Sequence, residues 1–130
     1  MIVLDASAVL EALLHTSAAE AVRARLFRSG RSLHVPHLID VEIAHALRRY
    51  ARIGLIDSER GRTALGDLTD LPLRRYPHAF LLPRVWDLRH NMTAYDALYV
   101  ALAEVLSATL LTRDGRLAAS AARYADVERV

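Results

Sequence analysis

Four acidic side chains, spread along the 130-residue chain, have the clearest capacity for chemistry: Asp5, Glu42, Asp96 and Asp114. Asp5 and Asp114 each follow a short apolar run, whereas Glu42 and Asp96 stand inside helical patterns. Converging carboxylates repel one another unless a cation lies among them, and such hard oxygen ligands suit Mg²⁺ or Mn²⁺. A site of this kind favours metal-assisted hydrolysis, in which bound ions activate water and neutralise charge that develops on a phosphodiester.

Each of these acids also has an ordinary structural role that its position could explain. Asp5 can cap the helix that follows it, and Asp114 can begin a turn. Glu42 can be a charge at the edge of a surface helix, and Asp96, three residues after Thr93, fits a capping box. The spacing of the acids alone leaves these alternatives open.

The apolar pattern around the acids predicts strands that alternate with helices. We expect strands at residues 2–4, 33–35, 73–76, 109–112 and 127–130, and helices at 8–15, 17–28, 36–52, from 57, 79–89 with a break near Pro83, 94–106 and 116–124. Alternation without hairpin signals favours an α/β fold with a parallel sheet covered on both faces. Ligand sites in such sheets lie beyond the carboxyl ends of the strands, where Asp5 and Asp114 are expected.

Two helices are expected to present the other two acids. In the helix over residues 36–52 the apolar stripe is expected to be Ile39, Ile43, Ala46 and Tyr50, with Glu42 one turn from two of its members. The helix over residues 94–106 is apolar on nearly every side and is therefore expected to be buried, although it carries Asp96.

The composition excludes several other kinds of enzyme. All 17 basic residues are arginine, and the net charge is +2. Because lysine is absent, Schiff-base catalysis and a Walker-A phosphate loop are excluded, and a receiver domain is disfavoured. A haloacid-dehalogenase-like phosphatase with Asp5 as nucleophile would need that lysine and an aspartate where this chain has Ser7. The absence of cysteine excludes disulfides and thiolate chemistry. The spacing of His34, His37 and His45 matches no standard zinc site.

Three segments resemble the motifs of PIN domains of the VapC toxin type. Residues 1–8 (MIVLDASA) resemble the opening strand, residues 91–104 (NMTAYDALYVALAE) the helix with the third acid, and residues 111–118 (LTRDGRLA) the segment with the fourth acid. Pro36 followed by Glu42 matches the helix that carries the second acid. The pieces occur in the family's order, in a chain whose length suits one PIN domain over residues 1–130. Residues 54–83 match no motif of the family.

The resemblance implies a fold, an activity and a set of site residues. The fold is a PIN-like three-layer sandwich, with a central parallel sheet flanked by helices. The activity is divalent-metal-dependent cleavage of RNA by an endoribonuclease, the toxin of a toxin–antitoxin pair, with Mg²⁺ or Mn²⁺ as cofactor. The residues that carry over are the metal-binding and catalytic acids Asp5, Glu42, Asp96 and Asp114, with Asp5 and Asp96 as principal ligands, and the supporting hydroxyls Ser7 and Thr112.

The resemblance also implies partners. They are an RNA substrate, a second copy of the chain in a homodimer, and a cognate VapB-type antitoxin that inserts a segment across the active site. Arg48, Arg49 and Arg52 continue the helix of Glu42 and are candidates for contacts with the RNA backbone. No apolar run is long enough to cross a bilayer, so we expect a cytoplasmic protein without a membrane partner. The alternative is a catalytically silent PIN scaffold that binds RNA or a partner, which need not keep all four acids.

Overall fold

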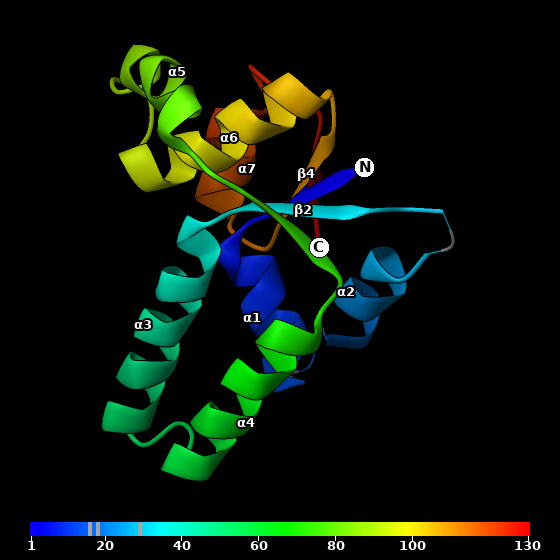
Figure 1. The fold of residues 1–130 in the computed structure, drawn as a ribbon, viewed down its shortest axis with the longest axis vertical. Helices are drawn as coiled ribbons and strands as arrows, with labels where there is room; N and C mark the ends of the chain where they lie inside the picture. The colour runs from blue at the N-terminus through cyan, green and yellow to red at the C-terminus, as the bar shows by residue number, and fades with distance from the viewer. Residues whose placement is uncertain (16, 18, 29) are drawn as a thin grey trace.

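The computed structural model of the protein describes residues 1–15, 17, 19–28 and 30–130. Strands and helices follow one another along these residues, as Figure 1 shows. They are β1 (Ile2–Leu4), α1 (Ala6–Leu14), α2 (Ala19–Leu26), β2 (Leu33–Pro36), α3 (Leu38–Arg52), α4 (Ser58–Asp70), β3 (Leu73–Tyr76), the 3-10 turn η1 (Ala79–Leu81), α5 (Leu82–Asp87), α6 (Ala94–Leu106), β4 (Thr109–Thr112), α7 (Gly115–Ala121) and β5 (Val127–Arg129).

The strands form one sheet in the order β3-β2-β1-β4-β5, and every neighbouring pair is parallel. From β1 the chain moves outward to β2 and β3, and then returns to β4 and β5 on the other side of β1. The direction of progress therefore reverses between β1 and β4, where Leu4 lies opposite Leu111. In open parallel sheets the crevice at such a reversal is where ligands bind.

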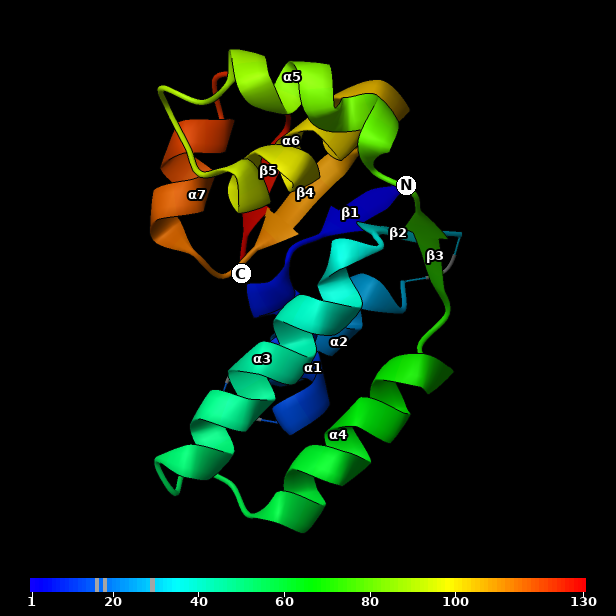
Figure 2. The same cartoon turned by 60° about the vertical axis from the view of Figure 1, so that its left-hand side comes forward.

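The helices cover both faces of the sheet, so the expected α/β three-layer sandwich is confirmed. Figure 2 shows α5, α6 and α7 on one face and α1, α2, α3 and α4 on the other. This division follows from the right-handed connection of parallel strands, because the outward and the return crossovers must lie on opposite faces. The helices α3 and α4 lie side by side and extend well beyond the sheet.

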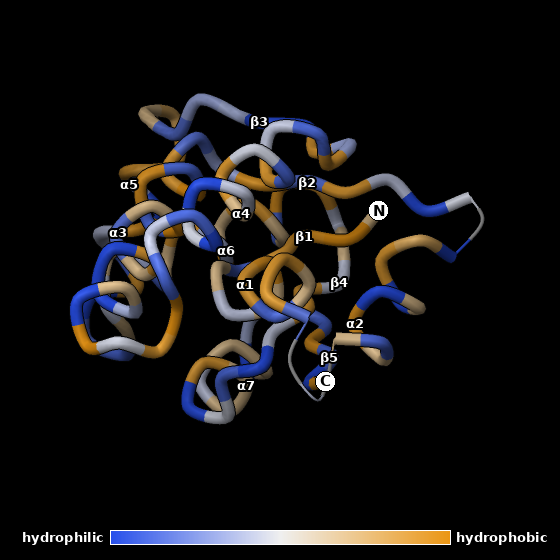
Figure 3. The backbone as a smooth tube through the Cα atoms, turned by 90° about the horizontal axis from the view of Figure 1, so that it is seen from below, coloured by the Kyte–Doolittle hydropathy of each residue, from blue (hydrophilic) through white to orange (hydrophobic). Residues whose placement is uncertain are grey.

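The core is built from the most apolar elements of the chain. All three residues of β1 are buried, and Figure 3 shows this apolar stretch in the middle of the molecule. In α6 the residues from Ala97 to Ala103 are all buried, as the apolar helix predicts. Burial of one large aliphatic side chain contributes about 1.5–3 kcal/mol to folding. Strand β1 and helix α6 thus provide a rigid base for the carboxylates attached to them.

Three local expectations need correction. The core face of α3 consists of Ile39, Ile43 and Leu47, whereas Ala46 and Tyr50 are only half-buried. Pro83 lies in the first turn of α5, where its missing N–H leaves no helical bond unmade, and not in a break. Asp114 does not begin an isolated turn, because it caps α7 directly. Among the described residues no helix combines the length and the apolar character needed to span a membrane.

Candidate active site

Asp5 stands where β1 ends and α1 begins, and it serves as the N-cap of α1. Its Oδ1 accepts the backbone N–H of Ala8 at 3.0 Å, which satisfies one of the free amides of the first turn. The residue is only 5% exposed. Asp5 therefore caps the helix, as its position in the sequence allowed. The same hydrogen bond fixes its carboxylate at the carboxyl end of the central strand.

Two hydroxyls hold Asp5 from the sides. Ser7 Oγ donates to Asp5 Oδ1 at 2.7 Å, and Thr112 Oγ1 donates to Asp5 Oδ2 at 2.6 Å. Each hydroxyl oxygen accepts a backbone N–H in turn, from Arg113 to Ser7 and from Asp114 to Thr112, both at 2.9 Å. The hydrogen bonds thus join the end of β1 to the segment that follows β4. Ser7 and Thr112 both lie next to Asp5, at the positions that the resemblance assigned to supporting residues.

Asp114 follows β4, the strand next to β1, and it is the N-cap of α7. Its Oδ1 accepts the backbone N–H groups of Arg116 at 2.8 Å and Leu117 at 3.3 Å. The residue is exposed. One oxygen of this carboxylate is thus engaged by the helix, while the side chain lies close enough to Asp5 to raise the pKa of Asp5.

Glu42 and Asp96 come from two helices that approach the same edge of the sheet. Glu42 lies on α3 and is half-buried, and its Oε1 accepts the hydroxyl of Tyr99 on α6 at 2.5 Å. Asp96 lies in the first turn of α6, where its backbone N–H donates to Thr93 Oγ1 at 3.2 Å. Thr93 is therefore the helix cap, as its position in the sequence predicts, and Asp96 is half-buried beside it.

The four acids, which we call the acid cluster, influence one another electrostatically. Burial raises the pKa of Asp5, and the charge of Asp114 adds to the rise, although three hydrogen bonds lower it. Burial also raises the pKa of Glu42, with Asp5 and Asp96 adding to it and the Tyr99 hydroxyl opposing it. The pKa of Asp96 is raised in the same way by burial and by the charges of Asp114 and Asp5, while Arg116 and Thr93 lower it.

The acid cluster has no cationic partner in direct contact within the part of the chain that the structure describes. Among the ion pairs between described residues, none involves a member of the cluster. A small divalent ion would remove the repulsion that raises these pKa values, and carboxylate oxygens are the ligands that Mg²⁺ and Mn²⁺ prefer. The chemistry of the donors therefore fits such an ion.

The acids of the cluster lie near one another, but their side chains are not arranged as a ready metal site among the described residues. In the described part of the chain, no three acidic or histidine side chains already stand in a geometry that could hold a metal ion. Asp5, Glu42 and Asp114 each accept hydrogen bonds from protein donors. His34, considered above for zinc, is buried and makes hydrogen bonds with Ser32 and Tyr76.

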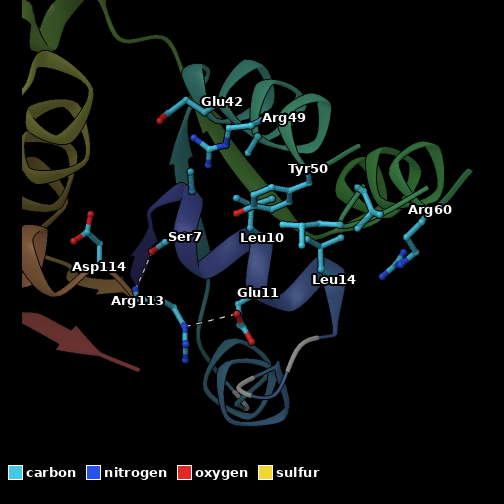
Figure 4. A pocket seen from close by; sticks show the side chains of 14 residues that line it. Ser7, Leu10, Glu11, Leu14, Glu42, Arg49, Tyr50, Arg60, Arg113 and Asp114 are labelled. Carbon is cyan, nitrogen blue, oxygen red and sulfur yellow. Dashed lines mark hydrogen bonds and ion pairs between the residues drawn. The ribbon is translucent and has the colours of Figure 1, made fainter. Parts of the chain in front are cut away.

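A groove of about 840 Å³ leads away from the cluster between α1, α3 and α4. Figure 4 shows Glu42 and Arg49 reaching it from α3, Ser7 from α1, and Arg113 and Asp114 from the segment after β4. Arg113 Nε lies 3.7 Å from Glu11 Oε2. The remaining lining is largely apolar and includes Leu10, Leu14, Leu55 and Ile56. We call this hollow the acid groove.

The structure separates the three arginines that the sequence suggested for RNA contacts. Arg49 lines the acid groove, whereas Arg48 and Arg52 are exposed and are not part of its lining. Arg49 lies seven positions after Glu42, two helical turns along the same face of α3, so the spacing alone could have singled out Arg49.

Two further residues at the site were not assigned a role from the sequence. Arg113 had no sequence signal beyond its place between Thr112 and Asp114. Tyr99 did have one, because it carries the one hydroxyl in an apolar stretch of α6, and a buried tyrosine hydroxyl needs a partner.

Comparisons with known proteins agree with this geometry. The family model described as the PIN domain matches residues 2–123. The ribonuclease VapC9 of Mycobacterium tuberculosis is 48% identical over 117 residues, which cover 90% of this chain and 88% of that protein. The ribonuclease VapC12 of the same organism is 42% identical over 130 residues, covering 100% of this chain and 99% of its own.

A solved structure shares the fold at much lower sequence identity. It is that of VapBC2 from Rickettsia felis bound to a DNA fragment from its promoter, with a TM-score of 0.71 and 16% identity. The match covers 99% of this chain and 98% of the other. The family match, the two ribonucleases and the shared fold all extend over nearly the whole chain. The chain therefore belongs to the PIN-domain family, in the branch that contains the VapC ribonucleases.

Proposed function

We propose that the protein is a divalent-metal-dependent endoribonuclease, the toxin of a VapBC-type pair, and that it hydrolyses RNA at the acid cluster with Mg²⁺ or Mn²⁺. The observation that supports this most strongly is the electrostatics of the cluster. Burial and mutual repulsion raise the pKa values of Asp5, Glu42 and Asp96, and no described cation is ion-paired with them. The names of the relatives, ribonucleases VapC9 and VapC12, support RNA as the substrate.

In this proposal each of the four acids has a part in binding the metal ion. Asp5 is the most rigid ligand, because three donors hold its two oxygens in place. Glu42, Asp96 and Asp114 surround it and would complete the ion's environment directly or through water. A bound ion would supply activated water and neutralise the charge that develops on the phosphodiester.

Arg49 and Arg113 would attract the RNA backbone to the acid groove. Both line the groove, and the guanidinium group offers paired donors that match phosphate oxygens. Without such cations the cluster itself would repel an RNA strand, so we assign them to holding the phosphates on either side of the site.

The same groove is suited to an antitoxin. Its floor is apolar and its end is acidic, so it fits a segment that presents apolar side chains followed by an arginine or lysine. Such a cation would compete with the metal for the acid cluster. The VapBC2 structure supports a VapB-type partner for this chain. We also propose a homodimer, for which exposed apolar residues such as Val41 and Trp86 are available.

The experiment that tests this function measures cleavage of RNA by the purified protein. We expect cleavage to stop in EDTA and to return when Mg²⁺ or Mn²⁺ is added, and titration of each ion identifies the preferred one. Asp5→Asn should be inactive, because an amide is nearly isosteric but brings no charge to the ion. Asp70→Asn, which changes an exposed aspartate at the end of α4, is the matched control and should cleave normally.

Two results would contradict the proposal. Cleavage by Asp5→Asn at the wild-type rate would place the chemistry elsewhere. RNA that is bound but never cleaved at any metal concentration would favour the alternative, a catalytically silent module on a PIN scaffold. In cells, expression of the chain alone should stop growth, and co-expression of its antitoxin should restore it.

A further inference from the structure

Tyr99, which is not one of the proposed metal ligands, makes a hydrogen bond across the site from α6 to α3. It lies on α6 one turn after Asp96, so the two side chains share a face of the helix. The residue is only 2% exposed, yet its hydroxyl reaches out of the core and donates to Glu42 Oε1 on α3 at 2.5 Å. One hydrogen bond therefore connects the helix that carries Asp96 to the carboxylate of Glu42.

Glu42 needs such a contact more than the other acids do. Its carboxylate stands at the end of a flexible side chain, and fixing that side chain in one rotamer costs conformational entropy. The charges of Asp5 and Asp96 act to push it away from the site. Within the described residues, the Tyr99 hydroxyl provides the one hydrogen bond to this carboxylate, and no ion pair reaches it.

The Tyr99 hydroxyl is a reliable donor. The residue is buried, and its O–H group donates directly to Glu42 Oε1. A buried hydroxyl whose partner is removed is left unsatisfied, which costs free energy. Movement of Glu42 away from Tyr99 is therefore opposed.

We propose that Tyr99 is a positioning residue, whose hydroxyl holds Glu42 within the acid cluster before a divalent ion arrives. This inference rests on the function proposed above. The ion then meets a ligand already held at the cluster and need not draw a flexible carboxylate toward two others of the same charge. Loss of a residue that orients a metal ligand commonly lowers metal affinity by roughly 10–100-fold.

The variant that tests this role is Tyr99→Phe, which keeps the ring in the core and removes only the hydroxyl. The control is Tyr95→Phe, the same change on the same helix at a residue that is 60% exposed. The melting temperature of each protein is measured as Mg²⁺ or Mn²⁺ is added. Tyr99→Phe should need a metal concentration roughly 10–100-fold higher than the wild type to reach half of the full rise in melting temperature. Tyr95→Phe should titrate like the wild type. The metal concentration for half-maximal RNA cleavage should move in parallel, while the KM for RNA at saturating metal stays the same.

A double-mutant cycle separates positioning of Glu42 from a general effect on the core. If Tyr99 acts through Glu42, Tyr99→Phe should not change the metal titration further in a Glu42→Ala background. An effect of equal size in that background, or a Tyr99→Phe protein that binds metal like the wild type, would overturn the proposal. Failure of the proposed function itself looks different, since the wild-type protein would then bind no ion or cleave no RNA.

The role can also be tested with Tyr99 in place, should the phenylalanine variant not fold. Exchange of the buried hydroxyl proton with water should be slow enough for it to be observed by NMR. Its signal should shift when Mg²⁺ is added to the wild-type protein, and it should be displaced or lost in Glu42→Ala without metal. A signal that is unchanged by both treatments would show that the hydroxyl does not report on Glu42 and would overturn the inference.

Discussion

The charge of Asp96 opposes folding as long as no cation is bound. Burial and the charges of Asp114 and Asp5 raise its pKa in the folded protein, and the same direction holds for Asp5 and Glu42. In the unfolded chain these groups titrate near their ordinary values, about 4. Above that pH the folded protein retains protons that the unfolded chain has released. Stability that is fully present at low pH is therefore lost as the pH rises through the raised folded values.

Asp96→Asn should reveal this effect in metal-free protein. At pH 7–8 we expect the variant to be more stable than the wild type toward urea in the presence of EDTA, because one repelling charge is gone. The difference should shrink toward zero below about pH 3, where the aspartate is protonated in both states. His34 titrates with the opposite sign, since burial lowers its pKa, but it is common to both proteins and cancels in the difference. A variant that is less stable at pH 8 would contradict the account.

Residue types predicted some members of the site and not others. Asp5 and Asp114 were expected at strand ends, and the structure brings both to neighbouring strands. The contact between Tyr99 and Glu42 was out of reach of the sequence because it joins residues 57 positions apart on different helices. Sequence periodicity describes one helix at a time, so it cannot show which face of α6 meets which residue of α3.

At the scale of elements, α3 forms one wall of the acid groove with a single stripe of residues. Glu42, Ala46 and Arg49 follow at helical spacing and all line the groove, while Ile39, Ile43 and Leu47 face the core. Two members of the expected core stripe, Ile39 and Ile43, are buried, but Ala46 and Tyr50 line the groove, because both are apolar enough for either place. Periodicity identifies an apolar face, but a groove wall and a core face carry similar residues.

Arg49→Ala should weaken RNA binding more than Arg52→Ala does. Both changes remove an exposed arginine from α3, but only Arg49 lines the acid groove. Loss of one phosphate contact to a single strand should reduce the slope of log K against log salt by about 0.7. The measurement is the affinity of metal-free protein for RNA at several salt concentrations. Equal effects of the two variants would mean that the RNA does not follow the groove.

Helix ends were predicted best where a capping residue precedes an apolar stretch. The bounds of α6 agree with the sequence expectation, because Thr93 caps the first turn through its hydroxyl. The last helix was placed later than it lies, since Asp114 was treated as a turn residue although it caps α7. An aspartate oxygen that accepts backbone N–H groups can begin a turn or cap a helix. The residues that follow the aspartate decide which of the two structures forms.

At the scale of the whole molecule, the site exists because the sheet order reverses between β1 and β4. Alternating strands and helices predicted the parallel sheet, but the pattern does not contain the strand order. Outward and return crossovers give the same local sequence signals, and only packing decides between them. The alternation did predict a sheet covered on both faces, and the resemblance to PIN domains implied the same three-layer architecture.

Binding of a divalent ion should stabilise the whole molecule, because the ion binds the folded acid cluster and not the unfolded chain. At a hundredfold excess over the dissociation constant the gain should be about 2.7 kcal/mol. Differential scanning calorimetry with and without Mg²⁺ or Mn²⁺ measures it as a rise in melting temperature. The rise should be much smaller in Asp5→Asn. An equal rise in that variant would mean that the ion binds outside the cluster.

The most direct test of the central claim is the rate of RNA cleavage by Asp96→Asn beside the wild type, at saturating metal. We expect cleavage to fall to background, while the metal-free variant melts at or above the temperature of the wild type. Loss of activity would then reflect the missing carboxylate and not a damaged fold. Cleavage by folded Asp96→Asn at the wild-type rate would contradict the account, because the acid cluster would not be the place where RNA is cut.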